Sequence, residues 1–261
     1  MWETLRNAWK VEELRKKLIY TFLMLVLFRL VGVIPVSGIN AAVVKEVAGN
    51  YDMLGLVNMM TGNSFSQMTI MAMGITPYIN SSIIMQLLTV AIPALERLQK
   101  DGGEEGKQKI NRITRYVTVA LAALQAIGII AGLQKSGNVL YPAYQNFFGY
   151  MTIGVIMAGG TALAMWIGER ITKNGIGNGV SLLIFAGIIA RLSSQIVSYV
   201  KNMFVGNVSV WAALVVLLIS LVMIVGVTLV ELAERRIPVQ YAKRVVGNKM
   251  YGGQTSRIPL K

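Results

Sequence analysis

Residues 69–93 read TIMAMGITPYINSSIIMQLLTVAIP, an apolar segment of membrane-spanning length that Gly74 and Pro77 interrupt near its start. Several polar side chains lie among its apolar residues. In hydrocarbon every backbone N–H and C=O must find a partner, so a break at membrane depth requires surrounding protein or a water-filled cavity. The segment therefore predicts a broken transmembrane helix that borders an interior pathway.

The composition is typical of a membrane protein. Of 261 residues, 54% are hydrophobic and only 14% are charged, and the mean hydropathy is +0.58, far from the balance of soluble domains. The chain contains neither cysteine nor histidine, which excludes disulfides, thiolate metal sites and histidine-based proton transfer. We expect a polytopic membrane protein with no cofactor and no enzymatic activity.

Membrane-spanning segments can be recognised by their length. A hydrocarbon core about 30 Å thick needs roughly 20 helical residues, and six segments of this chain meet the requirement. They are 18–35, 69–93, 116–133, 148–167, 180–200 and 210–232. The sequence therefore predicts an all-α fold with six transmembrane helices, the second of them broken.

Basic residues are concentrated in alternate connections. They cluster in the arm 1–17, after the second span, after the fourth span and in the tail 234–261. Because cytoplasmic loops carry an excess of Lys and Arg, we expect both ends of the chain in the cytoplasm. The net charge of +13 has two open explanations: attraction to anionic headgroups, or docking of ribosomal RNA or a motor protein.

Four motifs carry a resemblance to a known family. They are GITPYINSSIIMQLLTVAIP (74–93), RYVTVALAALQAIGIIAGL (115–133), MWIGERITKNGIGNGVSLLIFAGII (165–189) and ERRIPVQYAKRVVGNKMYGGQTSRIPLK (234–261). In this order they resemble SecY, the family of pore subunits of the bacterial general protein-secretion channel. The family has ten spans in two pseudosymmetric halves, and the resemblance covers the first six spans and the cytoplasmic loop after them.

The resemblance implies a division of the chain and a function. The parts are a cytoplasmic arm (1–17), a SecY-like N-terminal half (18–200), a sixth span (201–233) and a basic cytoplasmic loop (234–261), truncated before a seventh span. The implied function is a passive, gated pore in the bacterial inner membrane that moves unfolded polypeptides and releases transmembrane segments laterally into lipid. The implied partners are the SecE and SecG membrane subunits, the SecA ATPase, the ribosome, polypeptides with signal sequences, and membrane lipid.

The resemblance assigns four isoleucines to the family's hydrophobic pore ring: Ile75, Ile79, Ile184 and Ile188. Each pair lies four residues apart in its span, and so on one helix face. Apolar side chains at a constriction discourage a continuous water column and can part around a polypeptide of any sequence. From the residues alone, isoleucines at this spacing are also explained as core or lipid-facing residues.

The semi-polar segment 53–67, MLGLVNMMTGNSFSQ, resembles the family's plug, a small helix that seats against the ring from the extracytoplasmic side. Its candidate residues are Val57, Met59, Met60 and Phe65. Gly62 and Gly74 are candidate hinges, because glycine accepts backbone angles that other residues avoid. The alternative is an ordinary surface helix with a Met-rich contact face.

Polar residues follow the break in the second span, namely Asn80, Ser81 and Gln86. In the family this helix forms one side of a lateral gate toward lipid, so the three residues are gate candidates. Small polar residues also commonly join helices within membranes, and this alternative stays open.

The basic tail alternates apolar and basic positions around 241–246 and then carries Gly252–Gly253, which predicts a protruding hairpin or loop. The resemblance makes this loop the docking site for the ribosome or SecA. The candidate docking residues are Arg235, Arg236, Lys243, Arg244 and Lys249. Family members often carry a basic pair where this chain has Asn248–Lys249.

Charged residues in or beside apolar segments are costly and often functional. They are Arg29, Glu169, Arg170, Arg191 and Glu231. All but Arg29 lie near predicted span ends, where a long side chain can reach the interface, so Arg29 alone requires a partner inside the protein. The glycines of NGIGNG (174–179) predict a tight cytoplasmic turn rather than a nucleotide-binding loop, because no strand precedes them.

Two other function classes share some of these features. A secondary transporter also uses a broken helix near the midplane, but it usually couples to ions through intramembrane carboxylates, and the first five predicted spans have none well inside. An intramembrane protease would need a Ser–His pair, a His-bound metal or intramembrane Asp residues, which this chain lacks.

The tail generates a prediction. Reversing the charge at Arg236 with Arg236→Glu should weaken docking of the ribosome or SecA, because a basic surface steers acidic partners, while insertion of the chain into the membrane stays intact. Co-sedimentation of each partner with membrane vesicles measures the effect. Unchanged binding of both partners would contradict the docking assignment.

Overall fold

A computed structural model describes residues 11–49, 52–205, 209–239, 244–246, 249–251 and 256–260. The chain divides into two compact units, residues 1–195 and 196–261. Helix α9 (Gly179–Phe204) contributes to both units. Most of the expected N-terminal arm, residues 1–10, lies outside the described residues.

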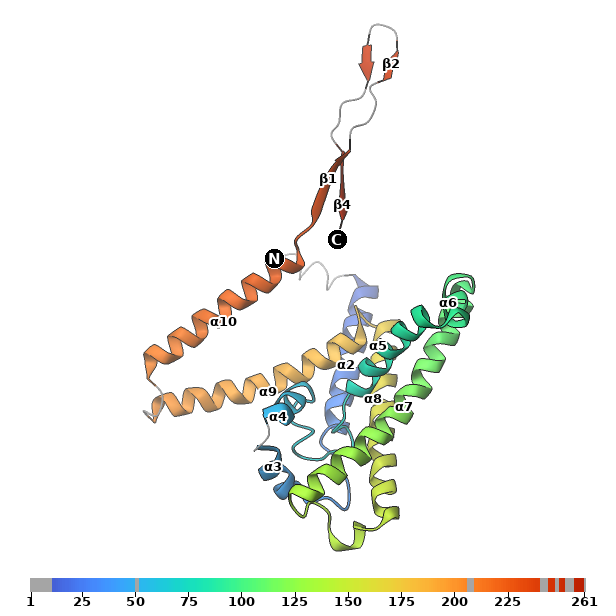
Figure 1. The fold of residues 1–261 in the computed structure, drawn as a ribbon. Helices are drawn as coiled ribbons and strands as arrows, with labels where there is room; N and C mark the ends of the chain where they lie inside the picture. Colours follow the sequence, from blue (N-terminus) through green and yellow to red (C-terminus); the bar gives the residue numbers. More distant parts are fainter. Residues whose placement is uncertain are drawn as a thin grey trace. The chain divides into compact units, whose positions relative to one another are not determined.

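The first unit is built from helices joined by turns (Figure 1). Its remaining elements are α2 (Glu12–Val31), α3 (Ala41–Gly49), α4 (Asp52–Met60), α5 (Thr76–Ala91), α6 (Pro93–Lys100), α7 (Gly103–Ser136), the short 3-10 helix η1 (Pro142–Tyr144) and α8 (Phe147–Asn174). The all-α character expected for the membrane-spanning part is confirmed for the described residues of this unit.

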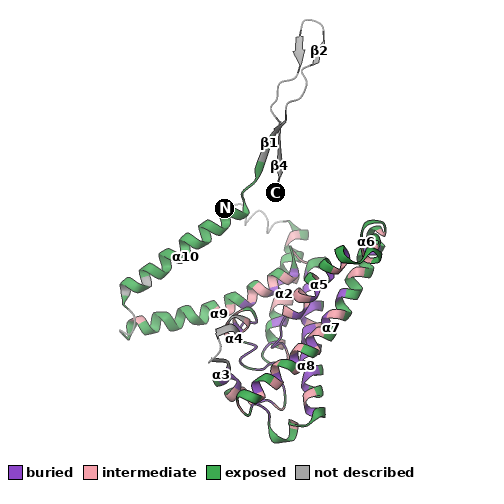
Figure 2. Ribbon diagram, viewed as in Figure 1, coloured by how far each residue is buried: buried purple, intermediate pink, exposed green. Residues whose placement is uncertain are grey.

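Helix α8 lies at the centre of the first unit. It packs beside α7 and α2, and α7 also packs against α5; Figure 2 shows buried residues along α8. Small residues make the close packing possible. A Cβ added at Gly154 would lie 2.8 Å from the Ile127 side chain of α7, and a Cβ at Gly160 would collide with the backbone carbonyl of Ile70.

Residues 61–75 form consecutive turns rather than a helix, and they are largely buried. Many of their backbone groups are nevertheless paired. Val36 N–H donates to the Met68 carbonyl at 2.9 Å and Ile70 N–H to the Ile34 carbonyl at 2.9 Å, while Ser66 N–H donates to Asn58 Oδ1 at 3.0 Å. The interruption in the second span is therefore an irregular segment enclosed by protein, as the requirement for paired backbone groups demands.

Helix α5 begins directly after this segment, with Pro77 in its first turn, where the missing N–H costs no hydrogen bond. The break expected at Gly74 and Pro77 is confirmed. A second bend was not predicted: α5 and α6 meet at an angle of 100°. Ile92 is extended (φ −107°, ψ 112°), because the residue before a proline disfavours the helical region, and Pro93 then starts α6.

The expected spans match helices to different degrees. Among the described residues, α7, α8, α9 and α10 (Val210–Glu231) are long and apolar enough to cross a membrane, and the bent pair α5–α6 makes a fifth if it is counted as one span. Helix α2 is not among them, because charged residues occupy both of its ends. The count of six spans stays a prediction.

The second unit contains the end of α9, helix α10 and two small antiparallel sheets. Strand β1 (Arg235–Val239) pairs with β4 (Ser256–Leu260), and β2 (Arg244–Val246) pairs with β3 (Lys249–Tyr251). The tail thus forms the nested strand pairs of a hairpin, as predicted. The Gly252–Gly253 turn signal lies outside the described residues.

Adjacent glycines of α8 provide a matched test of this packing. Gly160→Ala should destabilise the protein by about 1–3 kcal/mol, as overpacking typically does, because the added Cβ meets the Ile70 carbonyl. Gly159→Ala should be neutral or stabilising, since its Cβ meets nothing within 4 Å and alanine favours the helix by about 1 kcal/mol. Thermal unfolding midpoints in detergent measure both, and equal midpoints would contradict the packing.

Candidate functional site

The structure brings three of the four predicted ring isoleucines together. Ile75, which is 6% exposed, packs in one apolar cluster with Ile79 of α5 and Ile184 of α9. Ile188 is 40% exposed and lies outside this cluster. The ring cluster, as we call it, also contains the buried residues Phe28, Met71, Ala164, Ile167, Ile171 and Leu183.

A polar cavity of about 810 Å³ borders the ring cluster. Ile79 and Val180 belong to its lining and also to the ring cluster. The rest of the lining comes from α5, α7, α8 and the turn before α9, and includes Arg115, Glu169 and Lys173. A polar cavity therefore borders an apolar cluster that contains three of the predicted ring isoleucines.

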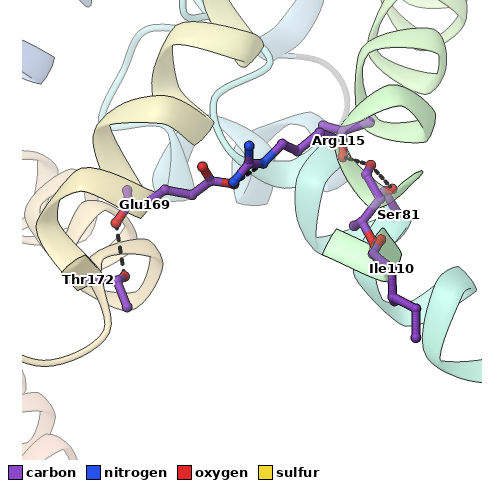
Figure 3. Close-up of polar contacts among 8 residues, drawn as sticks. Ser81, Ile110, Arg115, Glu169 and Thr172 are labelled. Atoms are coloured by element: carbon purple, nitrogen blue, oxygen red, sulfur yellow. Dashed lines mark hydrogen bonds and ion pairs between the residues drawn. The ribbon is translucent and has the colours of Figure 1, made fainter. Parts of the chain in front are cut away.

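Ionic contacts shape the wall of this cavity. Arg115 Nε of α7 lies 2.7 Å from Glu169 Oε1 of α8, and Figure 3 shows this pair bridging the two helices. The Arg170 guanidinium lies 5.4 Å from the centre of the Trp166 ring, within range of a cation–π contact. Glu169 and Arg170 were predicted to reach an interface; the structure places both in the cavity lining.

The plug candidates lie on α4 and the turns after it. The predicted range was 53–67, whereas α4 ends at Met60 and the remaining residues form turns. Phe65 is fully buried and Val57 half-buried, and both pack in a second apolar cluster with Ile130 and Ile153 of α7 and α8. Met59 is half-buried and Met60 is 38% exposed. Phe65 and Val57 therefore belong to a different cluster from Ile75, Ile79 and Ile184.

Helix α4 ends in a glycine cap. Gly62 has φ +63°, its N–H donates to the Met59 carbonyl at 3.3 Å, and the Asn63 N–H donates to the Asn58 carbonyl at 3.0 Å. These two bonds and the left-handed glycine define a Schellman motif. Gly74, the other candidate hinge, also has positive φ (+53°). Both positions therefore need the backbone freedom of glycine.

The end of α4 lies against α9 at Gly187, a contact that sequence reasoning missed. A Cβ at Gly187 would lie 2.5 Å from the Met60 carbonyl oxygen, and a Cβ at Gly62 would lie 3.1 Å from Gly187 Cα. Gly187 is one turn beyond Ile184, so the end of α4 lies beside the part of α9 that carries this predicted ring residue. The only signal in the sequence is a glycine inside the apolar run FAGII (185–189).

Two arginines donate to backbone carbonyls of this segment. Arg29 Nη1 of α2 donates to the Gly62 carbonyl at 3.0 Å, which supplies the partner that the sequence required but did not identify. Arg191 Nη1 of α9 donates to the Gly55 carbonyl at 3.0 Å. Arg191 was expected to reach an interface, and the structure instead binds it to α4.

The structure separates the three lateral-gate candidates. Ser81 is fully buried and donates to the Thr114 carbonyl of α7 at 2.9 Å (Figure 3), whereas Asn80 is half-buried and Gln86 is exposed. The placement of Ser81 favours the alternative in which a small polar residue joins two helices. Gln86 lies on the side of α5 that also exposes Ile83, Leu87 and Val90.

Four of the five docking candidates lie on the paired strands of the tail. Arg235 is exposed, and the register places Arg236 opposite Pro259, Arg244 opposite Tyr251 and Lys249 opposite Val246. Lys243 lies outside the described residues. The strands thus place basic residues in two consecutive strand pairs.

Comparison with known proteins identifies the family of this chain. A family model described as SecY matches residues 69–261. Protein translocase subunit SecY of Streptomyces galbus is 42% identical over 268 residues, which cover 98% of this chain and 60% of the relative. The same subunit of Thermotoga maritima is 37% identical and covers 100% of this chain and 61% of the relative. This chain therefore spans about three fifths of the length of these curated relatives.

Solved structures show the same fold. A protein conducting channel has a TM-score of 0.61 at 19% identity, covering 95% of this chain and 53% of that chain. A structure from work on the plug domain of the SecY protein also has a TM-score of 0.61, at 18% identity, covering 94% of this chain and 52% of that chain. The family model covers more than half of the residues, and so this chain belongs to the SecY family.

Proposed function

We propose that the chain forms one side of a gated channel through which unfolded polypeptides cross the membrane. The observation that carries the proposal is the ring cluster: Ile75, Ile79 and Ile184 lie together where a polar cavity ends. On α9, one turn beyond Ile184, Gly187 contacts the end of α4. In this proposal the ring cluster is an apolar constriction with water on one side and the movable helix α4 on the other. Such a pore can stay closed until a substrate enters.

The channel is passive, and its energy comes from partners. Apolar side chains disfavour a continuous water column but make no sequence-specific hydrogen bonds, so polypeptides of different sequence can pass. The sequence has no phosphate-binding loop. We assign the driving force to the SecA ATPase or the ribosome, docked on the basic tail, and expect SecE and SecG as membrane subunits of the complex.

The same proposal includes the lateral release of transmembrane segments into lipid and the membrane in which the protein lies. The exposed apolar side of α5, with Gln86 and half-buried Asn80 beside it, is the proposed wall of a lateral gate for signal sequences and transmembrane segments. The excess of basic residues at the arm and the tail supports a multi-pass protein of the bacterial inner membrane with both regions in the cytoplasm.

The secondary-transporter alternative is less well supported. Such proteins need a carboxylate free to bind a coupling ion near the midplane. Among the described residues that line the polar cavity, the carboxylate is Glu169, and Arg115 already holds it in an ion pair. The described lining of the cavity therefore has no unpaired carboxylate that could bind a coupling ion.

The proposed function is tested by transport. Inverted membrane vesicles carrying the protein as the cell makes it should import a polypeptide with a signal sequence when SecA and ATP are supplied. Protection of the imported polypeptide from added protease measures the activity. Vesicles that bind SecA but protect none of the substrate would contradict the function.

Within this function, Ile79→Asn should increase ion leakage through the resting channel, because a polar side chain at the constriction favours water entry. The matched control is Ile84→Asn, also on α5 but outside the ring cluster and 39% exposed. Collapse of an ion gradient across the vesicle membrane, followed with a fluorescent dye, measures the leak. Equal leakage from both variants would contradict the assignment of Ile79 to the pore ring.

A further inference from the structure

We propose that Arg29 and Arg191 are positioning residues that hold α4 in its seat, each through a hydrogen bond to a backbone carbonyl. Their bonds, at Gly62 and Gly55, set how readily α4 leaves α9. The proposal rests on the proposed function, in which α4 belongs to the plug, and it adds the residues that keep the plug closed.

Arg29 acts at the C-terminal end of α4. Its guanidinium donates to the Gly62 carbonyl, directly after the last turn of the helix. Carbonyl groups at this end carry the negative pole of the helix dipole, so a cation is favoured there. Bonds with an ionised donor are also stronger than neutral ones. The last turn of α2, where Arg29 lies, is therefore fixed to the end of α4.

Arg191 acts at the other end of α4. It comes from α9, 136 positions along the chain from Gly55, and donates to the Gly55 carbonyl in the first half of the nine-residue helix. Helices α2 and α9 thus each hold one part of α4. Release of α4 requires both bonds to break, and each arginine can act without the other.

The bonds matter for the seat because no apolar side chain of α4 that the structure describes is fully buried. Of its side chains that the structure describes, Asn58 is buried, Val57 and Met59 are half-buried, and Met60 is 38% exposed. The contact with α9 is made by backbone atoms at Gly187. At these described residues the apolar area removed from water, on which hydrophobic attraction depends, is incomplete, and the two charge-assisted bonds add to the attraction.

The test follows the exposure of a single cysteine in a chain that has none. Ser64→Cys places it two residues beyond Gly62, where Ser64 is 5% exposed. In membrane vesicles, Arg29→Ala and Arg191→Ala should each raise the rate of labelling by a water-soluble maleimide about tenfold, as expected for one charged hydrogen bond. The double variant should be labelled faster than either single variant.

Controls separate the bonds from general effects of lost charge. Arg112→Ala removes an exposed arginine of α7 and should leave labelling unchanged. Arg29→Lys keeps the charge without the planar donor group and should give an intermediate rate; it also carries the test if Arg29→Ala does not accumulate in the membrane. Labelling of both the Arg29 and the Arg191 variants at the unsubstituted rate would overturn the proposal.

Polypeptide import is measured in the same vesicles, so the two proposals can fail separately. Faster labelling without any import supports the arginine bonds and contradicts the channel function. Normal import with labelling unchanged by either arginine contradicts the bonds and leaves the channel function standing.

Discussion

The requirement that buried backbone groups be paired shapes the first unit. Residues 61–75 run as turns through its interior, and a chain in this conformation cannot satisfy its own N–H and C=O groups as a helix does. The pairing comes from elsewhere: from the stretch around Ile34 and Val36, from the Asn58 side chain, and from short bonds within the turns. Helices α2, α4, α5 and α8 are positioned around this segment, and the ring isoleucine Ile75 lies at its end.

Small residues let the surrounding helices come close enough to enclose that segment. Gly160 of α8 admits the Ile70 carbonyl, and Gly187 of α9 admits the end of α4. A Cβ added at Gly168 of α8 would lie at ordinary contact distance from Ile75 and Leu183, 3.5 and 3.4 Å. The segment 61–75 and the end of α4 are therefore held by close backbone contacts at glycine as well as by apolar side chains.

Much of this fold could be predicted from the sequence, because length and hydropathy determine which segments cross a membrane. The apolar runs that became α7, α8, α9 and α10 and the interruption before α5 were predicted, and so was the paired tail. The end of the second span at Pro93 was predicted, whereas the helix α6 that follows it at an angle of 100° was not. The contacts of individual polar side chains were harder to predict. The partners of Arg29, Arg191 and Ser81 are backbone carbonyls, and because every residue has one, residue types do not reveal which carbonyl accepts. Ring, plug and gate assignments came from the family resemblance, and they stay predictions.

Main-chain acceptors have an evolutionary consequence. Arg29 and Arg191 bind oxygens that every amino acid provides, so the side chains of α4 can be replaced without removing either acceptor. Related proteins can then diverge in this short helix and keep both bonds, provided that the two arginines and the glycine contact at Gly187 are retained. Selection would then act on Arg29, Arg191 and Gly187 and would tolerate substitutions of the side chains of α4.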